Sequence, residues 1–359
     1  MRYNKYFFEN FSMEVPFDVN DPRYVLSLDG VDPVLERVIN SSPYSLSIDD
    51  FEEVELIRAL LHIDVLQERN DRLGMGVPFF AEKDSEILKE FCISAADGIA
   101  GELLANKDRI SELARKIENG YPLERNLYHI LCGYIFDGLM FDYLEQNELV
   151  TTSCIHDSGS DYLVIIYEDA RSLNEYSDLM LCSYNRLTRN GKGFVSFGDS
   201  NGSRKDFYRF FRQKELSKLR EEEHAYTNFS AEQLIDGFEK LVKGIGVAPV
   251  LLEVFEYFGY CKNGKIDVPV FDSKSYDVAK ELYEFVLSLT KEKLSAALEL
   301  IQNEHRLLAV AHGVPPKDIA NEIYHLIFGE VNELLVKGGL VQNPPHIKGE
   351  GRYFKSFEC

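Results

Sequence analysis

Apolar residues recur at three- and four-residue spacing over much of the chain, which is the period of a helix buried along one face. This pattern predicts helices over residues 32–39 and 51–62, and a long helical region from about 84 to 120. Pro122 then opens a further helix, because proline is favoured in a first helical turn. Helices therefore dominate the expected fold.

A hairpin is predicted after the second helix. Two β-prone runs, residues 63–68 and 73–80, flank a polar turn at residues 69–72. Helices followed by a hairpin resemble a winged-helix domain over roughly residues 32–80. The resemblance implies a module that binds DNA or a protein partner.

The same pattern occurs a second time along the chain. Residues 76–83 are echoed by residues 267–274, with Pro78 matching Pro269 and Phe80 matching Phe271. Further matches follow in the same order: Tyr128-His129 with Tyr324-His325, Leu149-Val150 with Leu340-Val341, and Tyr162 with Tyr353. We interpret the echo as an internal duplication.

The fold class follows from these patterns. We expect an α+β, mainly helical protein whose duplicated helix–hairpin units, winged-helix-like, flank a small central insert that contains strands. Residues 1–31 are expected to form an irregular or weakly β lead-in, 32–168 the first unit, 169–228 the insert and 229–359 the second unit.

The insert is expected to hold two strands and one basic helix. Residues 179–184 and 193–197 are the predicted strands, which could form one sheet with residues 162–167. The helix is expected from about residue 205 to 223.

Composition limits the location and the partners. With 39 Lys and Arg against 60 Asp and Glu, the formal net charge is −21, which opposes generic coating of nucleic acid. The six cysteines are scattered without a C-x-x-C pair, which is typical of a reducing compartment. No apolar run is long enough to cross a bilayer, and no secretory leader is recognisable. We therefore expect a cytoplasmic protein without membrane contact.

One basic stretch stands out against this acidic background. Residues 181–220 hold ten Lys and Arg against three acids, within a chain that is otherwise acidic. A Gly/Ser-rich turn ends there at a predicted helix start, where backbone N–H groups favour anions. The hypothesis is an anion or nucleic-acid site formed by Ser203, Arg204, Lys205, Arg209 and Arg212. The alternative is a capped helix whose basic face meets acidic surface elsewhere in the chain.

The sequence offers no signature of catalysis. The eight histidines include no H-E-x-x-H motif and no Cys/His set at zinc spacing. Cys154, His156 and Asp157 lie close in sequence, but in a predicted turn, and convergence in space is what catalysis requires. No catalytic residue, metal or cofactor is therefore predicted, and the repeated Tyr-His pairs are interpreted as packing or hydrogen-bonding groups.

These observations favour a non-enzymatic regulator that binds protein or DNA, including a role in transcription regulation. Residues 51–62 carry Arg58 alone against several acids, and the second unit's corresponding helix, residues 250–258, has acids and no Lys or Arg. Helices with so few cationic side chains are poorly suited to recognise bases in the major groove of DNA. A protein partner is therefore favoured over DNA bound through residues 181–220, and a homo-oligomer is compatible with the sequence. The alternative function is a ligand or peptide sensor with an anion or phosphate site in the insert.

Overall fold

The protein is α+β, with 56% helix, 15% strand and several small sheets. The computed structural model describes residues 3–9, 18–152, 154–155, 161–173, 184–198, 204–215, 217, 219–301, 304, 306–344 and 350–357. Tertiary contacts divide the chain into two compact units. Unit 1 comprises residues 1–95, 141–177 and 292–327, and unit 2 comprises 96–140, 178–291 and 328–359.

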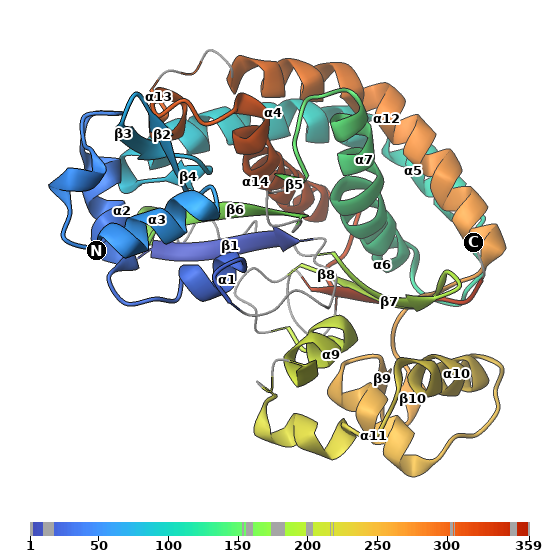
Figure 1. Cartoon of the computed structure of the whole chain (residues 1–359). Coiled ribbons are helices and arrows are strands. Elements are labelled where there is room, and N and C mark those ends of the chain that lie inside the picture. Colours follow the sequence, from blue (N-terminus) through green and yellow to red (C-terminus); the bar gives the residue numbers. More distant parts are fainter. Residues whose placement is uncertain are drawn as a thin grey trace. The chain divides into compact units, whose positions relative to one another are not determined.

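The sheet of unit 1 is built around one buried strand, β6 (Asp161–Glu168). Strand β1 (Tyr3–Glu9) pairs antiparallel with β6 along its whole length (Figure 1). The two-residue strand β4 (Phe79–Phe80) pairs parallel with β6, and β5 (Cys154–Ile155) pairs antiparallel with it. The continuous apolar run of β6 suits a strand that is covered on both faces.

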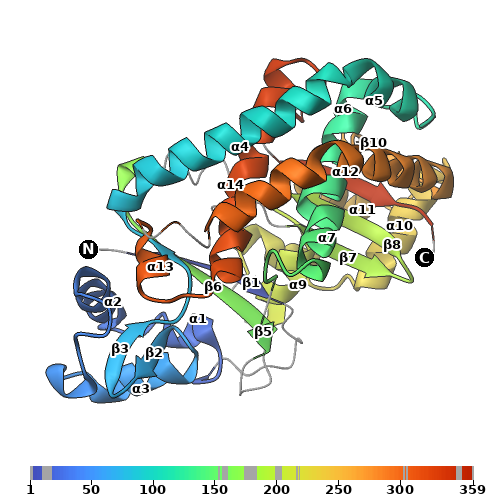
Figure 2. The same cartoon turned by 90° about the horizontal axis from the view of Figure 1, so that it is seen from above.

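A helix–helix–hairpin module precedes β4 in unit 1. Helix α2 (Val31–Asn40) and α3 (Val54–His62) pack against the hairpin of β2 (Leu66–Arg69) and β3 (Arg72–Met75) (Figure 2). The predicted hairpin is confirmed. Its two turn residues, Asn70 and Asp71, have φ of +52° and +60°, as a two-residue turn of mirror-image type requires.

Several local details of unit 1 differ from the sequence expectations. Helix α2 begins at Val31, one residue before the predicted start, after Gly30, whose φ of +89° suits glycine. The pair Ser47 and Asp50 caps a 3₁₀ turn at Ile48–Asp50, and α3 starts only after it. The lead-in contains β1, in keeping with its expected weakly β character, and also the short helix α1 (Pro22–Val25), which was not expected.

The sheet of unit 2 contains four strands in the order β11-β12-β8-β7. Strand β12 (Gly351–Lys355) lies between β8 (Lys192–Phe197), which is antiparallel to it, and the short β11 (Val270–Phe271), which is parallel to it. Strand β7 (Asn185–Arg189) pairs antiparallel with β8 at the edge.

A second helix–helix–hairpin module belongs to unit 2. Helix α10 (Ala231–Val242) and α11 (Pro249–Tyr257) are followed by the hairpin of β9 (Cys261–Lys262) and β10 (Lys265–Ile266), and then by β11. Helix α9 (Phe207–Glu215) and a 3₁₀ segment, Glu221–Tyr226, precede the module. The predicted single helix over 205–223 is therefore wrong, because α9 ends at Glu215. The aromatic core of this region includes Phe194, Phe207, Phe238, Phe255, Phe258, Tyr260 and Phe354.

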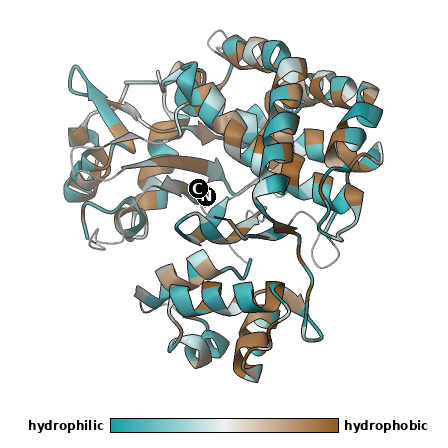
Figure 3. Cartoon of the chain, turned by 90° about the vertical axis from the view of Figure 1, so that its right-hand side faces the viewer, coloured by the Kyte–Doolittle hydropathy of each residue, from teal (hydrophilic) through white to brown (hydrophobic). Residues whose placement is uncertain are grey.

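Long helices complete both units. Helix α4 (Ser85–Ala105) leads to α5 (Lys107–Ala114), and α6 (Leu123–Leu127) continues through a π-helical segment, Tyr128–Leu139, into α7 (Met140–Gln146). Helix α12 (Ser273–Ile301), the short α13 (Leu308–Ala311) and α14 (Pro316–Lys337) follow in the last third. Teal and brown alternate along the helices, as expected when each buries one face (Figure 3). Within the described part of the chain, no helix combines the length and apolarity needed to cross a bilayer.

The two units share an order of elements. In each, two helices and a hairpin lead to a two-residue strand that pairs parallel with a longer central strand, β6 or β12. In each, a long antiparallel strand, β1 or β8, borders that central strand. The predicted domain boundaries follow sequence similarity and remain a prediction, because the compact units are defined by contacts and draw on three separate segments each.

Two sequence expectations about strands are wrong. Residues 162–167 and 193–197 do not share a sheet, since β6 and β8 belong to different sheets. The strand register also contradicts the match of Tyr162 with Tyr353. Phe79 and Val270 are matched residues, and the residues opposite them are Ile166 and Phe354. Tyr162 and Tyr353 are therefore not equivalent positions, and the predicted strand at 179–184 lies almost wholly outside the described residues.

Candidate functional site

The predicted anion site falls just before helix α9 in unit 2. Arg204 and Lys205 precede the helix, and Arg209 lies within its first turn. Ser203 lies outside the described residues, and for Arg212 the structure describes only a position in α9. Arg204 is 1% exposed and is among the largest fully buried side chains in the structure.

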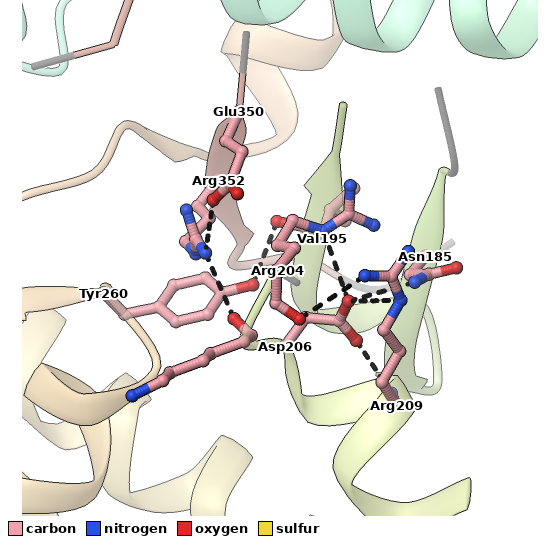
Figure 4. Close-up of polar contacts among 9 residues, drawn as sticks. Asn185, Val195, Arg204, Asp206, Arg209, Tyr260, Glu350 and Arg352 are labelled. Atoms are coloured by element: carbon pink, nitrogen blue, oxygen red, sulfur yellow. Dashed lines mark hydrogen bonds and ion pairs between the residues drawn. The ribbon is translucent and has the colours of Figure 1, made fainter. Parts of the chain in front are cut away.

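Asp206, one of the three acids within the basic stretch, organises this site. Its carboxylate accepts a hydrogen bond from the backbone N–H of Arg209 at 2.7 Å, which caps the start of α9. It also accepts from Arg204 Nε at 3.2 Å and from Asn185 Nδ2 at 3.0 Å (Figure 4). Arg209 Nε lies 3.5 Å from the same carboxylate. Arg204 Nε and the backbone N–H of Arg209, two donors that a bound anion could use, are thus engaged by the chain's own carboxylate.

A second buried arginine reaches the same region from the C-terminal strand. Arg352 on β12 donates to Glu350 Oε2 at 2.9 Å and to the backbone oxygen of Lys205 at 3.1 Å (Figure 4). Tyr260 donates to the backbone oxygen of Val195 at 3.0 Å beside it. We call Asn185, Arg204, Asp206, Arg209, Glu350 and Arg352 the Arg204 cluster. Each of its three arginines has an acidic partner within the cluster.

Other basic residues of the stretch 181–220 are also engaged within unit 2. Arg189 pairs with Glu232, and Lys192 pairs with Glu239 at 3.2 Å, both on α10. The Lys205 ammonium lies 3.9 Å from the centre of the Tyr257 ring, within cation–π range. This arrangement corresponds to the alternative interpretation, in which a basic face meets acidic surface.

A buried carboxylate of the π-helical segment, Asp137, interacts electrostatically with Arg204. Burial raises the pKa of Asp137 well above its ordinary range, and the charges of Arg204 and Arg186 offset only part of that increase. π-Helical geometry is rare and occurs often at functional positions. Gly133 in the same segment lets the Phe197 ring approach closely, since a Cβ there would lie 2.5 Å from that ring.

The histidines of the two Tyr-His pairs share one local geometry. His129 Nδ1 lies 2.6 Å from the backbone oxygen of Arg125, and His325 Nδ1 lies 3.0 Å from that of Asn321, four residues earlier in each case. Both rings are buried, and burial lowers the pKa of each histidine to about 4. Both histidines are therefore neutral hydrogen-bonding groups within packed helices, as the sequence interpretation expected.

Unit 1 contains a buried acid next to one of these pairs. Glu322 on α14 is fully buried and accepts a hydrogen bond from the Tyr167 hydroxyl at 2.7 Å. Its other oxygen, Oε2, lies 3.6 Å from His325 Nδ1 and has no hydrogen-bond partner among the described residues. Burial raises the pKa of Glu322 to about 8. The acid is therefore mostly protonated at neutral pH.

Sequence reasoning missed the residues that determine these sites. Asp206 had a recognisable signal, because it directly precedes an apolar-periodic helix and is a preferred capping residue. Glu350 and Arg352 had none, since they lie just before and within β12, and Arg352 is 147 residues from Lys205 along the chain. Glu322 was likewise hidden, because a lone acid within an apolar helix pattern does not reveal the direction in which it points.

Comparisons with known proteins do not assign the chain to a family. No protein-family model, no curated protein and no solved structure matches it. Among the described residues, no group of three or more His, Cys, Asp or Glu side chains is placed to hold a metal ion. The functional interpretation therefore rests on the geometry of the chain alone.

Proposed function

We propose that this protein is a non-enzymatic regulator whose winged-helix-like modules bind other proteins rather than DNA. The observation that carries the proposal is the charge of the second helix in each module. Helix α11 has no Lys or Arg and exposes Glu253 and Glu256. In α3, Arg58 is held by Glu55 at 2.8 Å. A helix that reads the major groove needs cationic or amide side chains aimed at bases and phosphates, and these helices present carboxylates.

An internal duplication is part of the proposal. It is supported by the common order of helices, hairpin and short parallel strand, and by the shared burial and backbone contact of His129 and His325. Strands β1 and β8 hold the same position beside the central strand of their own sheets. The copies then extend beyond the predicted units, and include part of the lead-in and part of the insert.

An anion or phosphate sensor at the Arg204 cluster is the second candidate. It draws support from the burial of Arg204 and from the convergence of three arginines on one region. The Asp206 carboxylate disfavours it, because an incoming anion would have to displace a buried acid that makes several hydrogen bonds. A concentration-dependent rise in melting temperature with inorganic phosphate or nucleotides would support the sensor.

The test of the proposed function compares protein and DNA as partners. The full chain is cross-linked in a lysate, and each captured protein is purified and titrated against it in isolation. A reconstituted complex, together with no mobility shift of random duplex DNA at 50 mM salt, is the expected outcome. A salt-dependent DNA shift with no reconstituted protein complex would overturn the proposal.

A further inference from the structure

The connection between α10 and α11 in unit 2 is apolar and exposed. Residues 245–250 read Ile-Gly-Val-Ala-Pro-Val, with Ile245 53% exposed and Val250 43% exposed. Ala248 and Pro249 between them are exposed as well. We call Ile245, Ala248, Pro249 and Val250 the connector surface. A run of exposed apolar residues is unusual in a folded protein and marks an interaction site when it is contiguous.

The connector surface is held in place by its own backbone. Gly244 has φ of +71°, and the backbone N–H of Ile245 donates to the Lys240 oxygen at 2.8 Å, which closes α10 with a Schellman-type cap. In that motif the residue after the glycine usually packs against the last helical turn. Ile245 instead stays half exposed, so its apolar side chain is available to a partner.

The close packing of α10 on α11 adds to this rigidity. A Cβ at Gly237 of α10 would lie 3.1 Å from Leu251 Cδ1, so the two helices are in contact just beneath the connection. Pro249 opens α11 and fixes the backbone at its first position. A surface that is ordered before binding loses less conformational entropy when a partner arrives.

Charge identifies the kind of partner. Helix α11 exposes Glu253 one turn after Val250 and Glu256 three residues later, and it carries no Lys or Arg. On α10, Glu232 and Glu239 are already paired with Arg189 and Lys192, so the acids of α11 set the charge beside the connector surface. Lys243 is itself 3.8 Å from Glu239. A second copy of this chain would bring a net charge of −21 and the same carboxylates to a self-complementary contact, which is unfavourable.

We propose that the connector surface docks a positively charged amphipathic segment of another protein, with apolar side chains on Ile245 and Val250 and a Lys or Arg beside Glu253. The inference rests on the proposed function and specifies where one module binds and what it binds. Unit 1 offers no counterpart, because its connection, residues 41–53, is mainly polar and carries four acids.

The test uses the full-length protein and two labelled peptides. One is a 14-residue amphipathic peptide of Leu and Lys, and the other has the same pattern with Glu in place of Lys. The protein variants are Ile245→Ser with Val250→Ser, Glu253→Lys, and a control, Leu300→Ser, at another exposed apolar residue (61% exposed). Fluorescence anisotropy gives each dissociation constant, and circular dichroism checks that each variant is folded.

We expect the Leu/Lys peptide to bind the native protein and the Leu/Glu peptide not to bind. The double serine variant should weaken binding about tenfold, because two apolar side chains lose their burial in the complex. Glu253→Lys should weaken binding several-fold, and Leu300→Ser should change it less than about twofold. Equal binding by the double variant would show only general attraction to an acidic protein, and would overturn the inference.

Two further outcomes separate the inference from the proposed function. A native dimer in sedimentation velocity that the double variant abolishes would assign the surface to a second copy, and the inference would be wrong. A reconstituted protein complex that the double variant binds unchanged would leave the proposed function standing and remove the connector surface from it.

Discussion

We predict that Glu322 makes the stability of unit 1 depend on pH, and that replacing it with glutamine removes its contribution to that dependence. The carboxyl group is fully buried, with Tyr167 as its hydrogen-bond donor and neutral His325 nearby. Burial raises its pKa from 4.5 to about 8. The folded protein therefore keeps a proton on Glu322 over a range of pH in which the unfolded chain has lost it.

The sign of the effect follows from this difference in proton binding. Between pH 4.5 and about 8, the native state binds one more proton at this site than the unfolded state, so the free energy of unfolding falls as pH rises. The decrease is about 1.4 kcal/mol per pH unit, which gives a loss of about 3 kcal/mol at pH 7 and about 5 kcal/mol above pH 8. Below pH 4.5 both states are protonated and the penalty disappears.

The substitution Glu322→Gln preserves the geometry and removes the titration. The amide oxygen can accept the Tyr167 hydrogen bond, and the amide nitrogen takes the place of the protonated oxygen. Under the proposed duplication, the position that matches Glu322 in unit 2 is Asn126, which lies two residues before Tyr128 and is a buried neutral amide. The variant should match the native protein within about 1 kcal/mol at pH 5 and exceed it by several kcal/mol at pH 9.

Urea unfolding at pH 5, 7 and 9 measures this difference, and the slope of unfolding free energy against urea checks that the denatured state is unchanged. Because other groups titrate in both proteins, only the difference between variant and native protein is interpreted. Glu299→Gln, at an exposed glutamate of α12, is the matched control and should show no pH-dependent difference. A Glu322→Gln curve parallel to the native curve at all three pH values would refute a raised pKa for Glu322.

Two further substitutions test the packing of unit 2. Asp206→Asn should lower the free energy of unfolding by about 3 kcal/mol, because it removes the charge that pairs with buried Arg204 and caps α9; urea unfolding measures it, and a loss under 1 kcal/mol would contradict the ion pair's role. Gly133→Ala should lower the melting temperature, with a destabilisation of about 1–3 kcal/mol from its clash with Phe197. Gly101→Ala, at a helical glycine with open space around its Cβ position, should be neutral or stabilising by up to about 1 kcal/mol, and equal effects of the two alanines would refute the steric argument.

The sequence by itself determined the local elements of this protein. The hairpin at Leu66–Met75 follows from β-prone residues around a turn in which Asn70 and Asp71 tolerate positive φ. The α+β class follows from helical periodicity interrupted by short apolar runs such as residues 162–167. The acidic second helices were likewise readable, because charge along a helix needs no tertiary information. The buried hydrogen-bonded state of His129 and His325 was anticipated from their recurrence in an apolar helical pattern.

Only the tertiary structure decided which strands pair and which charges meet. Strands β6 and β8 were expected to share a sheet, yet each pairs with partners brought from distant parts of the chain, since pairing depends on chain topology as well as on strand propensity. The basic stretch at residues 181–220 was expected to form an anion or nucleic-acid site, or else a capped helix whose basic face meets acidic surface. Packing places Asp206 against both Arg204 and Arg209, because burying a charge without a partner is strongly unfavourable.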